Sequence, residues 1–241
     1  MTYPYKQENI SFEVNNLLKK HKIEATLEAI TKLSKTIQNT IEFNQRLYDI
    51  GTLEGVSLAT TVEDLIDIYI LRSEVYREMN YNSEFPEFID GLDFDEYDEC
   101  SAIVYSKRDS SITGTCRLIF DSTERKLPID EKFCLDYLRN EKGMIGEGSR
   151  VIIKNIEGLK PEFKLLTIDA YRVLASYKVN LVSVMTANHL KLYTNFGGFS
   201  VEKKFQTYGK LDKEFFITLW RTAQISPFFK RIFLRHLKDV A

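Results

Sequence analysis

Two β-rich runs, at residues 101–106 (SAIVYS) and 112–120 (ITGTCRLIF), constrain the fold of this chain more than any other feature. The polar segment KRDSS that separates them has the length of a hairpin connection. This pattern predicts two neighbouring antiparallel strands. We therefore expect the sheet of the main domain to be built outward from this pair.

The segments that follow extend this sheet and add helices to it. The order of elements is typical of an α/β (α+β) domain, with a mostly antiparallel central sheet flanked by helices. The expected elements are a short helix near residues 134–140, a strand at 144–154, a helix at 161–178, a strand at 181–186, a helix at 187–196, and two strands at 199–208 and 214–222.

The N-terminal part of the chain has a different character. Apolar residues recur at helical spacing from Ile23 to about Ile50, which predicts an amphipathic helix of about seven turns. The segment GTLEGVSLATT then interrupts the pattern, and a capping box at Thr61 starts a second helix that ends near Met79. We predict an N-terminal helical extension at 1–52, the main domain at 53–225 and a C-terminal tail at 226–241.

Composition excludes several classes of function. The 33 Lys and Arg residues nearly balance the 35 Asp and Glu residues, which argues against nucleic acid as a partner. Three cysteines and three histidines show no spacing suited to a metal site, so we predict none. No apolar run is long enough to span a bilayer, and residues 1–10 lack a signal-peptide core, so we expect a cytoplasmic protein.

Charged residues stand beside apolar runs at four places along the chain. If these side chains point inward, the arginines require acidic partners, because an isolated buried charge is costly. In GEGSR, Glu147 and Ser149 would share one face of a strand and Arg150 the other, unless a bulge brings them together. The remaining members of this set are Arg72, Asp95, Asp98 and Arg117.

The ordered pattern R…VY…DFDEYD…GTCRL…GEGSR resembles the acyl-homoserine-lactone synthases and the related N-acyl amino acid synthases. Both are branches of the GNAT acyltransferase superfamily. The resemblance covers residues 62 to about 207, including VMTANHLKLYTNFGGF, which is similar to the end of a GNAT domain. It implies a GNAT-like fold and the transfer of an acyl group to an amine.

The resemblance also implies roles for individual residues. Glu147 matches the carboxylate proposed to help deprotonate the acceptor amine, with Ser149 and Arg150 as its neighbours, and partnership with an arginine is the alternative for Glu147. Backbone N–H groups within residues 150–153 would stabilise the oxyanion. The ion-paired framework around the acceptor would consist of Arg72, Asp95, Asp98 and Arg117; the alternative is a purely structural network, which can coexist with a nearby active site.

A third group of residues is expected to bind the acyl chain and the pantetheine arm. These are Val151, Ile153, Met185, Thr186, Tyr193 and Phe196. For the apolar members near residues 184–196, spacing alone favours the alternative that they belong to the hydrophobic core.

Two departures from the family pattern guide the choice of substrates. The interval NIEGLKPEF has one glycine, Gly158, where GNAT enzymes that use free coenzyme A carry a glycine-rich pyrophosphate loop. This favours acyl-phosphopantetheine on acyl carrier protein as donor over acyl-CoA, with no bound cofactor. The lactone synthases resembled here usually have a Trp after the Arg72 helix, but the single Trp of this chain is Trp220. An amino acid or another small-molecule amine is therefore the favoured acceptor.

Two alternatives stay open. One is a lactone synthase that uses S-adenosylmethionine, and the other is a non-catalytic GNAT-like sensor of an acylated ligand. The C-terminal segment ISPFFKRIFLRHLKDVA is basic and amphipathic. It could pack on the domain, dock acyl carrier protein, or make peripheral contact with an anionic membrane.

Overall fold

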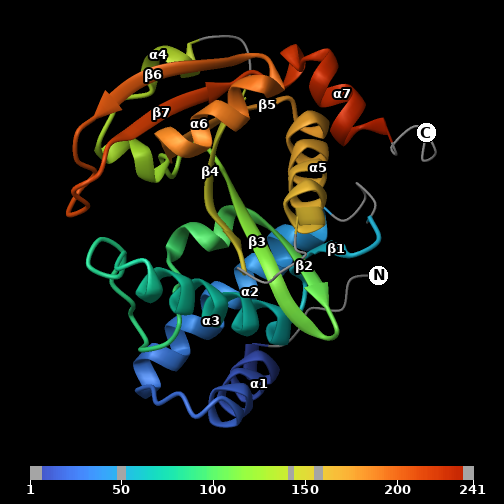
Figure 1. Ribbon diagram of the computed structural model, residues 1–241. Helices are drawn as coiled ribbons and strands as arrows, with labels where there is room; N and C mark the ends of the chain where they lie inside the picture. Colours follow the sequence, from blue (N-terminus) through green and yellow to red (C-terminus); the bar gives the residue numbers. More distant parts are fainter. Residues whose placement is uncertain (1–6, 48–52, 141–143, 155–159, 236–241) are drawn as a thin grey trace.

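The computed structural model describes residues 7–47, 53–140, 144–154 and 160–235. Within these residues one sheet has the strand order β1-β2-β3-β4-β5-β7-β6 (Figure 1). All neighbouring strands are antiparallel except β4 and β5, which are parallel. This confirms the predicted mostly antiparallel sheet. The strands are β1 Val56–Leu58, β2 Ser101–Arg108, β3 Ser111–Phe120, β4 Met144–Ile153, β5 Val179–Thr186, β6 Phe199–Phe205 and β7 Phe215–Trp220.

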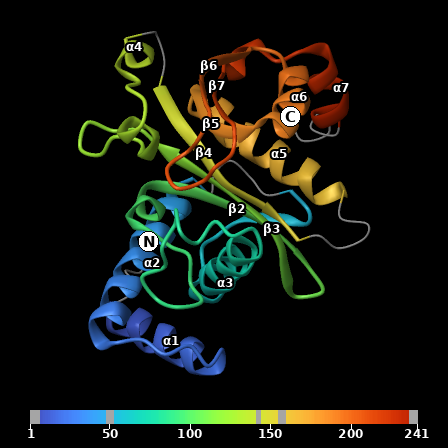
Figure 2. The ribbon, with the colours of Figure 1, turned by 60° about the vertical axis from the view of Figure 1, so that its left-hand side comes forward.

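Helices cover both faces of the sheet. In Figures 1 and 2, α1, α2 and α3 lie on one side of β2 and β3, and α5 lies on the other. The α-helices are α1 Gln7–Lys20, α2 Leu27–Arg46, α3 Val62–Glu78, α4 Asp136–Arg139, α5 Lys160–Ser176, α6 Ala187–Tyr193 and α7 Pro227–Phe233. In the described part of the chain, short 3₁₀ turns accompany them: η2 Glu96–Cys100, η3 Pro128–Glu131, η4 Thr194–Phe196 and η5 Thr222–Gln224.

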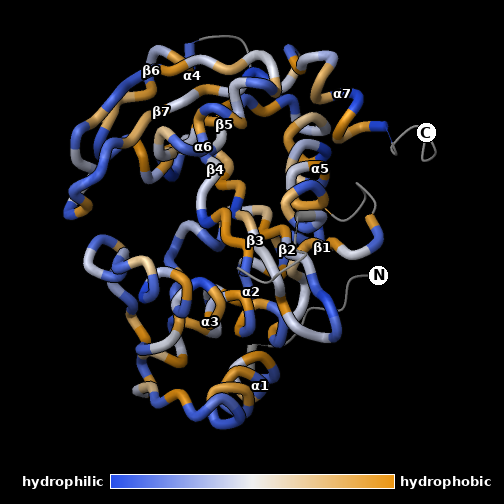
Figure 3. Tube along the Cα trace, viewed as in Figure 1, coloured by the Kyte–Doolittle hydropathy of each residue, from blue (hydrophilic) through white to orange (hydrophobic). Residues whose placement is uncertain are grey.

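Strand β2 shows how the sequence divides the core between these two layers. Side chains alternate along a strand, so Ile103 and Tyr105 join the cluster with α3, while Ala102 and Val104 join the cluster with α5. All four are buried. Both faces of this central strand are therefore apolar, and Figure 3 shows the hydrophobic stretches that run through the sheet and α5.

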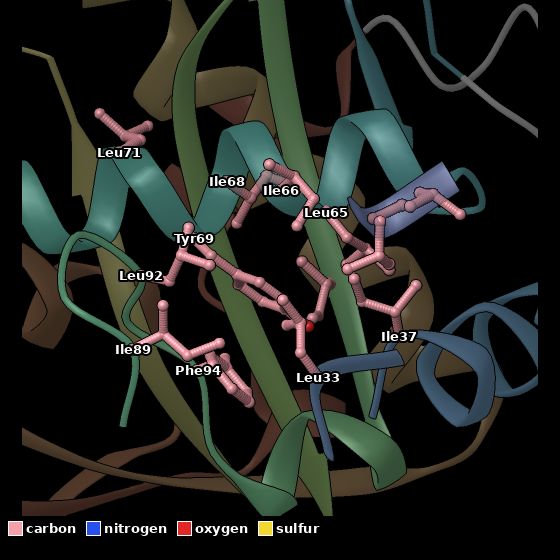
Figure 4. Packing of buried hydrophobic residues seen from close by; sticks show 14 of the residues in the cluster. Leu33, Ile37, Leu65, Ile66, Ile68, Tyr69, Leu71, Ile89, Leu92 and Phe94 are labelled. Carbon is pink, nitrogen blue, oxygen red and sulfur yellow. The ribbon is translucent and has the colours of Figure 1, made fainter. Parts of the chain in front are cut away.

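The N-terminal helices belong to the same hydrophobic cluster as α3. Leu33 and Ile37 of α2 are fully buried and pack with Leu65, Ile66 and the neighbouring core residues (Figure 4). The apolar stripe of α2 is therefore covered within the chain. The division of the chain at residues 52 and 226 stays a prediction.

The structure corrects three details at the N-terminal side. Helix α2 begins at Leu27 and not at Ile23, because the side chain of Thr26 accepts a hydrogen bond from the Ala29 N–H and caps the helix. Helix α1 was not expected. The segment interpreted as a joint contains β1, which pairs with β2 along three residues.

Some expectations fall outside the described residues. They concern the end of the first helix near Ile50, the boundary near residue 52, Gly158, and the tail beyond Arg235. The start of the second helix at Thr61 is confirmed, because the Thr61 side chain accepts a hydrogen bond from the Asp64 N–H. The Asp64 carboxylate accepts from the Thr61 hydroxyl at 2.7 Å, whereas in a capping box it would accept from the Thr61 N–H. Among the helices described, none has the length and apolar character needed to cross a membrane.

Candidate active site

Strand β4 carries a bulge within GEGSR. Ser149 pairs with Arg117 of β3, and Ile152 pairs with Thr115, so two residues of β4 face a single residue of β3. Arg150 lies at this bulge with φ = 53°, in the left-handed region that few residues other than glycine adopt. Arg150 is buried, whereas Val151 is 51% exposed. The bulge therefore keeps the Arg150 side chain buried, and a bulge at this place is one of the two arrangements that the sequence analysis considered.

Glu147 points into the protein from the same strand. The residue is 6% exposed, and its Oε2 accepts a hydrogen bond from the Ile129 N–H at 2.9 Å. Burial raises the pKa of Glu147 to about 7, although the Ile129 N–H and the positive charges of Arg117 and Arg150 act in the opposite direction. A carboxyl group with this pKa changes its protonation near neutral pH, as a general base requires.

A buried ion-pair network joins α3, η2 and β3. Arg72 Nη1 donates to Asp98 Oδ1 at 2.9 Å, and Arg117 Nη1 donates to the same oxygen at 3.2 Å. Arg117 Nη1 also donates to Asp95 Oδ1 at 2.5 Å, and Arg117 Nε donates to Ser149 Oγ at 3.0 Å. The inference that these arginines and aspartates need one another is confirmed by these contacts.

Within this network, Arg72 and Asp98 are fully enclosed. Their side chains are 0% exposed, so neither presents an atom on the surface. Their contacts connect the helix that carries Arg72 to the turn that carries Asp98. This geometry supports a structural role for the pair more directly than contact with a substrate.

The D-x-x-D spacing of Asp95 and Asp98 has a local cause. Asp95 caps η2 by accepting from the Tyr97 N–H at 2.9 Å, and Asp98 accepts from the Asp95 N–H at 3.1 Å. Burial would raise the pKa of Asp95, but Arg117 and Arg150 lower it to about 2. Asp95 is therefore ionised over the whole physiological range.

Arg150 contacts Asp95, an acidic partner that the sequence suggested, and three residues that sequence reasoning missed: Asp93, Tyr76 and Phe85. Its Nε lies 3.1 Å from Asp93 Oδ2, and its Nη2 donates to Asp95 Oδ2 at 3.3 Å. The guanidinium carbon also lies 5.0 Å from the ring centre of Tyr76 and 4.5 Å from that of Phe85. Asp93 belongs to the DFDEYD motif, so its position beside Asp95 could have suggested it.

Strands β4 and β5 separate beside these residues. Their pairing ends at Gly148 and Ser183, although β4 continues to Ile153 and β5 to Thr186. Backbone N–H groups of β4 that point toward β5 beyond Gly148 therefore lose their partner strand. This is the segment in which the sequence analysis expected donors for an oxyanion.

The residues predicted to bind the acyl chain and pantetheine come from four elements, β4, β5, α6 and η4. Val151 and Ile153 lie on β4 beyond the point of separation, and Met185 and Thr186 lie at the end of β5. Phe196 is 0% exposed, and its ring packs against several aromatic rings of the core, which favours the core interpretation for this residue. Its neighbours are Tyr193, Trp220, Phe229 and Phe233.

Two surface cavities lie at other positions. One of about 370 Å³ is lined by residues that include Asp121, Arg139 and Met144, and one of about 310 Å³ is lined by residues that include Glu99 and Arg125. Neither includes Glu147. Among the described residues, no cluster of His, Cys, Asp or Glu has the geometry of a metal site.

Comparisons with known proteins agree with the residue pattern. The sequence model of the family described as N-acyl amino acid synthase FeeM matches residues 67–219. A search of curated protein sequences returned no match.

Solved structures of acyl transferring enzymes share the fold. FeeM, an N-acyl amino acid synthase from uncultured soil microbes, aligns with a TM-score of 0.56 and 12% identity over 76% of this chain and 96% of that chain. The AHL synthase LasI aligns with a TM-score of 0.53 and 20% identity over 71% and 91%. BjaI, a CoA-dependent acyl-homoserine lactone synthase solved with SAM and isopentyl-CoA, aligns with a TM-score of 0.53 and 14% identity over 81% of this chain and 86% of that chain.

Proposed function

The chain belongs to the family of the N-acyl amino acid synthase FeeM and is an N-acyltransferase with a GNAT-like fold, and we propose that it transfers a fatty acyl group from acyl carrier protein to the amine of an amino acid. The observation that carries this proposal is the buried Glu147 carboxylate. It lies on β4 immediately before the point where β4 and β5 separate.

Glu147 would act as the general base. An amino acid binds as an ammonium ion, and its nitrogen must lose a proton before it can attack a thioester carbonyl. A carboxylate with a pKa of about 7 accepts that proton directly or through one water molecule at neutral pH. The C–N bond then forms, the C–S bond breaks, and the pantetheine sulfur takes a proton and leaves as a thiol.

The separated strands would hold the donor. A thioester placed between β4 and β5 would present its carbonyl oxygen to those N–H groups of residues 150–153 that point toward β5. Arg117 and Ser149 then keep β4 in register beside Glu147 through the Arg117 Nε to Ser149 Oγ bond. No covalent intermediate on the protein is needed.

Acyl carrier protein is the proposed donor for two reasons. The segment after β4 lacks the glycine-rich sequence that would cradle the pyrophosphate of coenzyme A. Helix α7 also exposes Lys230 and Arg231, and Arg235 is exposed just after it; these residues could meet the acidic surface of a carrier protein. BjaI is described as CoA-dependent, so acyl-CoA is the alternative donor that the experiment must test.

An amino acid is preferred to S-adenosylmethionine as acceptor because the segment after the Arg72 helix lacks the Trp that is usual in the lactone synthases and carries Tyr81 instead. The Tyr81 ring packs against Tyr76, which lies beside the Arg150 guanidinium. Trp220 lies in the aromatic cluster of β7, away from this group.

The test is a matrix of donors and acceptors with product detection by mass spectrometry. Medium- and long-chain acyl carrier protein and acyl-CoA thioesters are each incubated with single amino acids or with S-adenosylmethionine. We expect an N-acyl amino acid from the carrier protein donor. Glu147→Gln should lower kcat by about 10²- to 10⁴-fold, the usual contribution of a general base.

Each other outcome has a defined meaning. The control variant Glu24→Gln changes the net charge equally in an exposed segment between α1 and α2 and should keep full activity. Product formed from acyl-CoA alone would contradict the proposal that acyl carrier protein is the donor. Formation of an acyl-homoserine lactone would contradict the proposal that an amino acid is the acceptor. Binding of acyl groups without any product would favour the sensor alternative.

A further inference from the structure

The loop Leu127–Leu135 contacts Glu147 from outside the motifs that identify the site. We call this segment the brace loop. Its contribution is the Ile129 N–H, which donates to Glu147 Oε2, while the Ile129 side chain is fully buried in the core. The position of one backbone amide therefore fixes one oxygen of the proposed base.

The brace loop is closed on itself by Asp130. The Oδ2 atom of Asp130 accepts from the Leu127 N–H at 3.1 Å, and its Oδ1 accepts from the Leu135 N–H at 3.2 Å. One carboxylate thus holds both ends of the loop and the turn η3 between them. Any movement of Asp130 is transmitted to Ile129, the preceding residue.

Arg139 anchors this carboxylate to the sheet. It donates to Asp130 through Nη1 at 2.8 Å and Nη2 at 2.5 Å. It also donates through Nε at 2.7 Å and Nη2 at 2.8 Å to Asp121, which directly follows β3. Burial alone would raise the pKa of Asp130, but Arg139 and the two N–H groups lower it. The fork of one guanidinium therefore connects the loop to the end of the strand.

From these contacts we propose that Arg139 is a positioning residue that holds the brace loop so that the Ile129 N–H stays bonded to Glu147. Arg139 acts through Asp130 and touches no reacting atom. The proposal rests on the role of Glu147 in the proposed function, but its direct test does not require catalysis.

Other charges that influence Glu147 come from neighbouring elements and stay in place when Arg139 is changed. They are Arg117 on β3, Arg150 on β4, Asp95 and Tyr97 at η2, and Tyr208 on the β6–β7 connection. On its other side the brace loop is tied to this connection, because Lys132 pairs with Glu84 and lies 4.0 Å from the Tyr208 ring centre. The Glu84 carboxylate in turn accepts from the Lys210 N–H at 2.7 Å.

Two substitutions separate positioning from a long-range effect of charge. Arg139→Gln removes a positive charge and Asp121→Asn removes a negative one, yet both break the anchor. In both variants the hydrogen bond from the Ile129 N–H to Glu147 is weakened, and this raises the pKa of Glu147 by about half a unit. A purely electrostatic effect raises it in Arg139→Gln and lowers it in Asp121→Asn. Lys126→Gln is the charge control. Lys126 is exposed and pairs with Asp136 at 3.4 Å; Asp136 also accepts from Arg139 Nη1 at 3.1 Å, but the bonds from Arg139 to Asp121 and Asp130 stay in place in this variant.

The measurement is an NMR titration of protein labelled with ¹³C at glutamate side-chain carboxyls. The Glu147 signal is identified by its absence in Glu147→Gln. We expect its midpoint to rise in Arg139→Gln and Asp121→Asn, to return toward the wild-type value in Arg139→Lys, and to stay unchanged in Lys126→Gln. An unchanged midpoint in both anchor variants, or a fall in Asp121→Asn, would overturn the proposal.

Activity gives an independent second readout. The acid limb of the pH profile of kcat/KM should move with the NMR midpoint, giving about a twofold loss near pH 7 that disappears at high pH. If no acyl transfer is found, the NMR result still decides whether Arg139 positions Glu147. If Arg139→Gln does not fold, Asp121→Asn and Arg139→Lys decide the question.

Discussion

Replacing Glu147 by glutamine should make the protein more stable above neutral pH while it removes activity. The folded protein raises the pKa of Glu147 from 4.5 to about 7, chiefly by burial. Between these two values the unfolded chain releases the proton while the folded protein retains it. Stability therefore falls as pH rises through this window, and the loss is complete above the folded pKa.

The size of the effect follows from the shift of about 2.5 units between these pKa values. At about 1.4 kcal/mol per unit, the ionised Glu147 costs about 3 kcal/mol of folding free energy. Glutamine has nearly the same shape and can still accept from the Ile129 N–H, but it cannot ionise. The variant should therefore match the wild type near pH 4 and exceed it by about 3 kcal/mol near pH 8.

Urea unfolding at these two pH values measures the difference. Fluorescence of Trp220, the single tryptophan, and far-UV circular dichroism should give coincident transitions if unfolding is two-state. The expected gain near pH 8 corresponds to a rise in Tm of about 6–12 °C for a chain of this length. Glu24→Gln, on the surface, controls for the change in net charge. Equal stability of Glu147→Gln and wild type near pH 8, or the same difference at both pH values, would refute the reasoning.

Three further predictions concern the ion-pair network beside Glu147 and a glycine turn elsewhere in the fold. Asp98→Asn should cost about 3–5 kcal/mol in urea unfolding because it leaves buried arginines short of a partner, whereas Glu63→Gln at an exposed pair should cost at most about 1 kcal/mol. Gly197→Ala should lower the free energy of unfolding by about 3 kcal/mol in thermal unfolding, because φ is 80° and a Cβ would lie 2.5 Å from a backbone nitrogen. In the control Gly55→Ala the nearest atom would lie 3.5 Å from the Cβ, so the cost should be about 1 kcal/mol. The pKa of Asp95 is lowered to about 2, so its ion pairs stabilise the protein above about pH 4 and are lost as pH falls toward 2; acid titration of Asp95→Asn should lack this slope.

The order of strands and helices in the main domain could be predicted from sequence because local signals marked each element. The polar KRDSS connection lies at the β2–β3 hairpin, and the β-rich run of residues 181–186 lies within β5. Strand β1 has only three residues beside a glycine-rich segment, which is too short to show the alternation of apolar and polar residues that predicts a strand. Helix α1 was missed although Ile10, Val14 and Leu18 are buried at helical spacing.

The charged site could be predicted only in part. Charged residues beside apolar runs indicated that Arg117 and Arg150 needed acidic partners. The D-x-x-D motif supplied Asp95 for both arginines and Asp98 for Arg117. The Ile129 amide could not be found in this way, because a backbone N–H leaves no mark in the sequence. Its approach to Glu147 depends on a loop whose closure involves Asp130 and Arg139, which are ordinary surface residue types in the sequence.

The five residues GEGSR at 146–150 contradict the local rules for a strand, and this supports the proposal that the site lies on β4. A strand prefers extended backbone and apolar inward side chains, yet GEGSR places Arg150 at positive φ and buries the Glu147 carboxylate. A fold that only needed a core strand would gain stability by losing both features, as the effect expected for Glu147→Gln makes explicit. The surrounding arginines, aspartates and the brace loop hold an arrangement that costs stability, and such a cost is expected where the chain performs chemistry.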